Sequence, residues 1–209
     1  MRKVLGLAIS PHPPIAIPEI GAGQEKEAQK TIDGMQEMAK AVASKKPEVI
    51  VVITPHGNVF ADGICLLAEE KIEGDLERFG RPDLKMEKSV SLDILEDLSN
   101  AFEEKGIPSI FMNYSIGESY KAKVEIDHGA FVPLYYIDKQ WSDYEIVHIT
   151  IGMLSPIEMY ELGKTIGEVL ETAAYETIVL ASGDMSHCLK EEGPYSYHPM
   201  GKVFDEKIV

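Results

Sequence analysis

The run Val-Ile-Val-Val-Ile at residues 49–53 constrains the fold of this chain more than any other segment. It is apolar on both sides of a strand, so both faces of that strand must be covered. Such burial is typical of a central strand in a sheet that lies between helices. We therefore expect a strand over residues 48–53, in the middle of a layered α/β structure.

Shorter strand-like runs and amphipathic helical segments alternate around this central run. Alternation of this kind predicts an α/β fold with three α/β/α layers and a central, mostly parallel or mixed sheet. At 209 residues the chain fits one domain, spanning residues 1–209. Strands are expected at residues 4–9, 63–68, 109–112, 145–151 and 177–181, helices at 24–44, 91–105, 130–137 and 156–172, and an irregular segment or hairpin at 72–82.

The charge and the cysteine content limit the partners and the location. A formal net charge of −15 makes nucleic acid and anionic membrane surfaces unfavourable partners. The apolar run at the N-terminus is cut short by Pro11, and no segment approaches the length of a membrane span. Cys65 and Cys188 lie far apart and form no C-x-x-C motif, so a reduced cytoplasm is the expected setting.

Four histidines adjoin the ends of apolar runs, each beside Pro, Gly, Asp or Ser. In an α/β sheet, ligands bind at the carboxyl ends of the strands, so we expect the four side chains to converge in one cleft. They occur in Ser10-Pro11-His12-Pro13-Pro14, Thr54-Pro55-His56-Gly57, Asp127-His128-Gly129 and Ser182-Gly183-Asp184-Met185-Ser186-His187.

His12 and His56 share a Pro-His context, which favours a role as metal ligands. A proline fixes φ and makes the exit from the strand rigid, so an imidazole placed there loses little entropy on binding. Two neutral imidazoles suit Fe, Zn, Cu, Ni or Mn. The alternative is that each is an ordinary loop histidine bonded to the backbone.

His128 and His187 are candidates for moving protons. His128 could act as a general acid or base at a helix start, or it could be incidental to an N-capping Asp127. Asp184 could orient a neighbouring imidazole, or it could cap an ordinary turn. The G-x-S-x-G pattern is missing around Ser182, which disfavours a serine hydrolase.

The remaining histidines carry weaker signals. His148 lies inside a strand-like run and is expected to be a core or edge residue. His198 stands among tyrosines, where it could line the pocket or pack in an aromatic loop. We place Asp127, Asp184, Ser186 and His198 around the substrate, and expect Cys188 to be a small buried residue.

Taken in order, the four motifs resemble those of the catalytic B subunit of class III extradiol ring-cleavage dioxygenases, the LigB-like superfamily. They are also similar to the related Memo-like proteins, which accompany a radical-SAM protein in some microbes. The resemblance spans nearly the whole chain. It implies a three-layer fold, an Fe(II) ion held by His12 and His56 (with Zn or Cu as alternatives), and cleavage of a catechol-type ring with O2. It also implies that His187 is the base and that His128 protonates or stabilises the oxygenated substrate.

The resemblance leaves the third metal ligand unassigned. In the family a carboxylate well downstream of the His187 motif fills this role, and no residue here matches it. We expect Asp184 to support the ligands rather than bind the metal. The helix expected from residue 199 has no stop signal, so we expect the domain to be truncated, with the third ligand either absent or beyond residue 209; a short docked helix is the alternative.

Two other functions remain open at this point. One is a Memo-like accessory or metal-binding protein that has no dioxygenase turnover and serves a partner enzyme. The other is a zinc-dependent hydrolase that uses the same histidines. A homo-oligomer or a partner subunit is compatible with any of the three functions.

Overall fold

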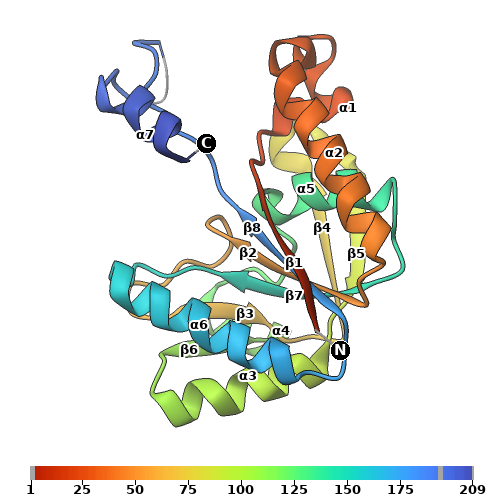
Figure 1. Ribbon diagram of the computed structural model, residues 1–209, viewed down its shortest axis with the longest axis vertical. Helices are drawn as coiled ribbons and strands as arrows, with labels where there is room; N and C mark the ends of the chain where they lie inside the picture. The colour runs from red at the N-terminus through yellow and green to blue at the C-terminus, as the bar shows by residue number, and fades with distance from the viewer. Residues whose placement is uncertain (1–2, 193–194, 209) are drawn as a thin grey trace.

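The computed structural model describes residues 3–192 and 195–208, and its centre is a six-stranded sheet (Figure 1). The strands lie side by side in the order β1, β8, β2, β7, β3, β6. Their bounds are β1 (Val4–Ser10), β2 (Val49–Thr54), β3 (Ile64–Leu67), β6 (Ser109–Met112), β7 (Glu145–Thr150) and β8 (Thr177–Ser182).

The sheet is mixed, with four neighbouring parallel strands on one side. β1, β8, β2 and β7 run parallel, whereas β3 pairs antiparallel with β7 and parallel with β6. The register places Ser10 opposite Ser182 and Thr54 opposite Thr150, so the four parallel strands end at one edge. That edge carries the segments that follow β1, β2 and β8.

Helices cover both faces of the sheet. In Figure 1, α2 (Gln29–Lys45) and α5 (His128–Asp138) pack together on one face, and α3 (Leu92–Lys105) and α6 (Pro156–Thr172) on the other. Residues 49–52 of β2 are fully buried between these layers, as their uninterrupted apolar run requires. The predicted three-layer α/β fold with a mixed sheet is confirmed.

Local signals account for where several helices start and stop. Ser155 and Glu158 form a reciprocal capping box at the start of α6. Gly106 ends α3 with φ of 65°, a left-handed conformation that glycine adopts without strain. Asn113 caps α4 (Tyr114–Tyr120), a helix not predicted from the sequence, by accepting a hydrogen bond from the Ile116 N–H at 2.9 Å.

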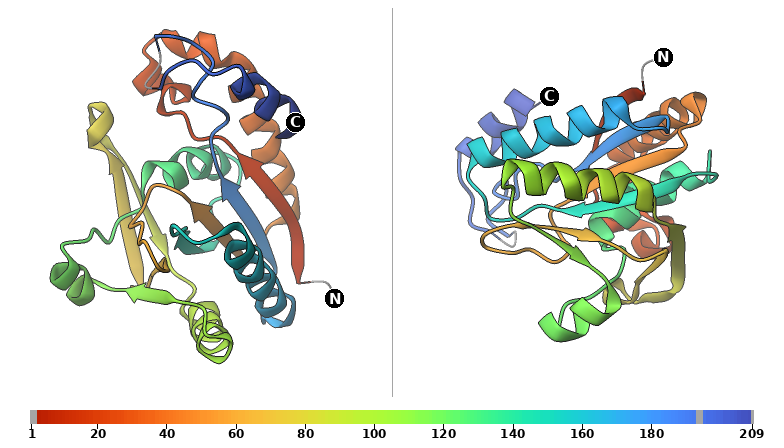
Figure 2. Two further views of the ribbon diagram at one scale, coloured as in Figure 1. Left: turned by 90° about the vertical axis from the view of Figure 1, so that its left-hand side faces the viewer. Right: turned by 90° about the horizontal axis from the view of Figure 1, so that it is seen from below.

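A separate hairpin stands beside the main sheet, next to α5 (Figure 2, left). It pairs β4 (Lys71–Leu76) with β5 (Arg81–Ser89), so the hairpin alternative for residues 72–82 is the one observed, and its second strand runs longer than expected. In β4, exposed and buried residues strictly alternate, because only one side of the hairpin faces the core.

The remaining helical elements are short or lie near the C-terminus. Among the described residues, no helix is both long and apolar enough to cross a bilayer. These elements are η1 (Pro14–Ala16), α1 (Pro18–Gly21), η2 (Gln24–Ala28), η3 (Glu77–Phe79) and α7 (Met200–Ile208).

Candidate metal centre and active site

Three of the four predicted site histidines form a close cluster at the carboxyl edge of the sheet. His12 follows β1, His56 follows β2, and His128 is the first residue of α5. One ring nitrogen from each lies within 4.8 Å of the other two. The ring centroids are 4.7 Å apart for His12 and His56 and 4.2 Å apart for His56 and His128. The three imidazoles could therefore face one small ligand or ion.

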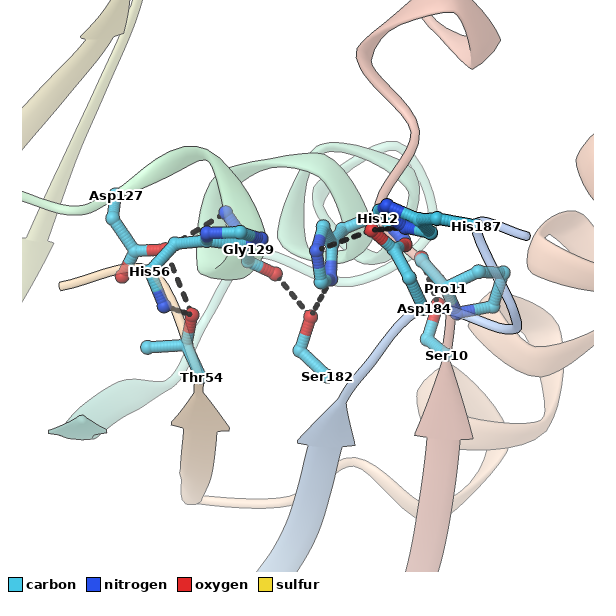
Figure 3. A network of polar contacts seen from close by, with 10 residues as sticks. All are labelled: Ser10, Pro11, His12, Thr54, His56, Asp127, Gly129, Ser182, Asp184 and His187. Atoms are coloured by element: carbon cyan, nitrogen blue, oxygen red, sulfur yellow. Dashed lines mark hydrogen bonds and ion pairs between the residues drawn. The ribbon is translucent and has the colours of Figure 1, made fainter. Parts of the chain in front are cut away.

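Asp184 connects the fourth histidine to this cluster (Figure 3). Its Oδ2 lies 3.2 Å from Nε2 of His12 and 3.2 Å from Nε2 of His187. Burial raises the pKa of Asp184, but the interactions with His12 and then His187 outweigh that effect and hold the pKa at about 2. The carboxylate is therefore ionised at neutral pH, between two imidazoles.

An open groove of about 390 Å³ lies against His12, His56 and His187. Its other walls come from Pro55, Asp184, Met185, Cys188 and Tyr195. The Tyr195 and His187 rings are 5.7 Å apart. Met185 was not predicted from the sequence to belong to the site, although it directly follows Asp184, whereas Tyr195 is one of the tyrosines near His198 that were weighed as pocket residues.

A buried Asp–His pair supports the start of α5. Oδ2 of Asp127 lies 2.7 Å from Nε2 of His148, and its Oδ1 accepts hydrogen bonds from the Thr54 hydroxyl (2.7 Å) and the Gly129 N–H (2.8 Å). Burial raises the pKa of Asp127, but these contacts, led by His148, bring it down to about 2. Asp127 thus ties α5, which carries His128, to the end of β2 and to the interior of β7.

His148 is fully buried in β7, as expected from its place in an apolar run. Its pairing with Asp127 was not expected. A polar ring inside an otherwise apolar strand was the available signal, since a buried polar group requires a partner.

Burial also affects the clustered imidazoles. It lowers the pKa of His56, and the neighbouring His12 adds to the effect. Burial, together with His56, lowers the pKa of His128 to about 4. Both rings are therefore neutral at pH 7, which metal binding requires of histidine ligands.

Hydroxyl side chains end all four parallel strands. They are Ser10, Thr54, Thr150 and Ser182. The Ser182 hydroxyl donates to the Gly129 carbonyl oxygen and lies 2.7 Å from Nδ1 of His12 (Figure 3). A hydroxyl at the end of each apolar run is a sequence signal for this polar edge, although the site was predicted from the histidines alone.

Two predicted site residues lie elsewhere. The Ser186 N–H donates to Asp205 of α7, and its hydroxyl accepts from the Cys188 N–H, so Ser186 shapes a turn. His198 is exposed, and its Nδ1 accepts from the Met200 N–H at the start of α7. Neither residue lines the groove beside His12 and His56. Cys188 is half-buried and does line it.

The tip of the β4–β5 hairpin covers the other side of the cluster. The Phe79 ring lies 5.1 Å from the His128 ring. A cavity of about 90 Å³ beneath the tip is lined by charged residues that include Arg78, Glu77 and Lys123. The histidine cluster thus has an apolar groove on one side and a small charged cavity on the other.

Comparison with known proteins identifies the family of this chain. A family model described as the catalytic LigB subunit of aromatic ring-opening dioxygenase matches residues 6–209. A protein of Clostridium acetobutylicum, whose name is only a locus designation, is 38% identical over 204 residues, which are 98% of this chain and 44% of that protein.

A second relative carries a functional name. The 2,3-dihydroxyphenylpropionate/2,3-dihydroxicinnamic acid 1,2-dioxygenase of Photorhabdus laumondii is 25% identical over 182 residues, 81% of this chain and 53% of that enzyme. This chain therefore spans about half the length of these relatives. A solved Plasmodium knowlesi structure, described as a homologue of P. falciparum PNP, reaches a TM-score of only 0.38, with 12% identity over 65% of this chain and 66% of its own. Because the family model covers nearly every residue, the chain belongs to the family of the catalytic LigB subunit of aromatic ring-opening dioxygenases.

Proposed function

We propose that this chain holds the metal centre of a dioxygenase that opens a catechol-type aromatic ring with O2. The observation that carries the proposal is the cluster of His12, His56 and His128 at the carboxyl edge of the sheet, beside a groove wide enough for a small ring. Membership of the LigB family supports this proposal. So does the relative from Photorhabdus laumondii, whose name gives an aromatic diol as its substrate.

In this proposal His12 and His56 hold the metal. Nε2 of His12 is buried and has no hydrogen-bond partner among the described residues, and Oδ2 of Asp184 lies 3.2 Å from it. A lone pair and a carboxylate oxygen at that distance repel each other unless a cation, either a proton or a metal ion, lies between them. The donor set of imidazole nitrogens fits Fe(II), with Zn or Cu as alternatives. Fe(II) held there would bind the diol and activate O2 for ring opening.

The two other histidines handle protons. His128 is a neutral, half-buried imidazole that faces the same space as His12 and His56, so it could exchange a proton with an oxygen of the substrate. His187 lies at the groove, where the ionised Asp184 would stabilise the imidazolium that forms when His187 accepts a proton from a diol.

The groove fits an aromatic ring. Pro55, Met185 and Tyr195 give it apolar walls next to the polar cluster. A flat ring could lie against these side chains while its hydroxyl groups face the imidazoles. The substrate in this proposal is a small aromatic diol, and residues 1–209 form a single domain that carries the site.

Anaerobic reconstitution tests the proposal. The protein is loaded with Fe(II), mixed with catechol or 2,3-dihydroxyphenylpropionate, and exposed to O2, while oxygen uptake and the yellow colour of a ring-opened product are recorded. We expect bound iron and substrate-dependent oxygen uptake, both lost in His12→Ala and His56→Ala. Failure to bind iron would overturn the proposal. Iron binding without oxygen uptake for any diol would favour the accessory metal-binding function instead.

The cluster of three imidazoles also favours a second candidate, a zinc-dependent hydrolase. Zinc sites in enzymes commonly use three protein ligands with a water in the fourth position. Hydrolysis of an ester or amide by the Zn(II) form, at the same rate with and without oxygen, would support this function over ring opening.

A further inference from the structure

We propose that Ser182 is a positioning residue that selects the tautomer of His12, and that Pro133 inside α5 makes this possible. Pro133 leaves the Gly129 carbonyl without a helical hydrogen bond. The Ser182 hydroxyl donates to that carbonyl, and the same hydroxyl contacts His12. The consequence for metal binding rests on the proposed function, in which His12 is a ligand, whereas the tautomer itself does not depend on it.

The first step is a backbone carbonyl without its usual partner. In an α-helix the N–H of residue i bonds to the carbonyl of residue i−4, which pairs residue 133 with Gly129 in α5. Pro133 has no N–H, so the Gly129 carbonyl lacks this hydrogen bond. A buried carbonyl requires another donor.

The second step is the direction of one hydroxyl proton. The Ser182 hydroxyl donates to the Gly129 carbonyl, which has no proton of its own to share. A serine hydroxyl has a single proton, so toward His12 the same oxygen must accept. Nδ1 of His12 lies 2.7 Å away and must therefore carry the hydrogen.

The third step is the state of the other ring nitrogen. With the hydrogen on Nδ1, Nε2 is the nitrogen left to face a metal ion, or a proton shared with Oδ2 of Asp184 at 3.2 Å, and it is buried without a hydrogen-bond partner in the described structure. A histidine that ligates a metal generally has its other nitrogen bonded in this way, which sets both the tautomer and the ring orientation.

The position of the Gly129 carbonyl is itself restrained. A Cβ at Gly129 would lie 2.4 Å from Oγ1 of Thr54 and 2.8 Å from Oδ1 of Asp127, so only glycine fits. The Gly129 N–H is bonded to Asp127 at 2.8 Å. The carbonyl therefore offers Ser182 an acceptor at a well-defined place.

Histidine tautomers in the metal-free protein, measured by long-range 1H–15N NMR, test the proposal directly. We expect Nδ1 of wild-type His12 to carry a hydrogen, whether or not Nε2 shares a proton with Asp184. Ser182→Ala should give a mixture of tautomers, and Ser182→Thr, which keeps the hydroxyl, should restore the wild-type spectrum. Ser10→Ala is a matched control, because Ser10 is the register partner of Ser182 on β1 and its hydroxyl donates to the Pro11 carbonyl oxygen rather than contacting His12.

Zn(II) affinity, measured by competition with a chelator, gives the second readout. Loss of such a supporting contact should weaken Zn(II) binding by about 10- to 100-fold in Ser182→Ala. We expect a smaller loss in Pro133→Ala, where a new N–H competes for the Gly129 carbonyl, and less than about 2-fold in Ser10→Ala. Circular dichroism establishes that each variant is folded.

Two results would overturn the proposal. One is a single Nδ1-protonated tautomer of His12 in Ser182→Ala, and the other is wild-type Zn(II) affinity in that variant. If instead wild-type His12 shows the expected tautomer but the protein binds neither Zn(II) nor Fe(II), the proposed function fails while the role of Ser182 stands.

Discussion

The two sides of the histidine cluster are built differently. On the side of β2 and α5, the Asp127 carboxylate is buried and makes three hydrogen bonds within 2.8 Å, which link Thr54, Gly129 and His148. On the side of β8, the His187 side chain is 45% exposed, and its contact with Asp184 is 3.2 Å long. The loop that follows leads to α7, which stands apart from the helix layers (Figure 1).

This difference matches what the two sides would have to do. Metal ligands must be held in place before the metal arrives, which a buried and hydrogen-bonded carboxylate such as Asp127 favours. A substrate must enter and leave, and elements with few buried contacts open at the lowest cost in free energy. In the proposed function, we infer that the β2–α5 side, together with Ser182 at the end of β8, sets the metal geometry, and that the segment after β8 that carries His187 admits the substrate.

The largest expected effect separates catalysis from metal binding. His187→Ala should lower the turnover of the Fe(II) protein by about 10²- to 10⁴-fold, the usual contribution of a general acid or base. Bound iron, measured by elemental analysis, should stay close to the wild-type amount. If His187→Ala lost its iron together with its turnover, His187 would help to hold the metal. The exposed side would then not differ from the β2–α5 side in this role.

A large effect on stability is expected on the buried side. His148→Leu removes the partner of a buried carboxylate and should lower the free energy of unfolding by about 3–5 kcal/mol in urea denaturation. His187→Leu, the matched change on the exposed side, should alter it by less than about 0.5 kcal/mol. Equal losses in the two variants would show that the two sides do not differ in support.

Acid should weaken the buried side selectively. The pKa of Asp127 is about 2 in the folded protein against an ordinary value of 3.8, so unfolding favours its protonation. Its contribution, roughly 2 kcal/mol, should be complete above pH 3.8 and disappear as the pH falls to about 2. The difference in unfolding free energy between wild type and Asp127→Asn should shrink over that interval. A difference that does not change with pH would contradict this assignment.

The smallest expected effect concerns the groove. Truncating Tyr195 or Met185 to Ala removes apolar wall next to the substrate, worth about 1 kcal/mol, so KM for a catechol should rise about 5-fold. Metal content and unfolding free energy should stay at wild-type values. A loss of bound iron in either variant would instead mean that the truncated side chain helps to hold the metal.

Most of the layered fold was predictable from periodicity. The apolar run at residues 49–53 required burial on both faces, and the amphipathic segments around it required a sheet to pack on. The antiparallel placement of β3 was not predictable, because strand direction depends on how the chain crosses the sheet and not on local pattern. The helix α4 was missed because its main local signal is the single cap Asn113.

The sequence was sufficient to predict which histidines form the candidate site and at which edge of the sheet they lie. Histidines after strand ends had to share an edge once β1, β2 and β8 were parallel neighbours. The roles assigned to His12, His56, His128 and His187 remain predictions, because proximity alone does not establish which of them bind a metal.

The sequence by itself determined the order of the strands and helices. It also determined which strand ends carry histidines and hydroxyls, since both features follow from local pattern and composition. Only the tertiary structure decided that Asp127 pairs with His148, and that Ser182 bonds both Gly129 and His12. These partners are 21 to 170 residues apart, and their contacts depend on strand register and on the exact position of a helix end. Such contacts are set by packing of the whole domain, because a hydrogen bond requires alignment within a few tenths of an ångström that no local segment controls.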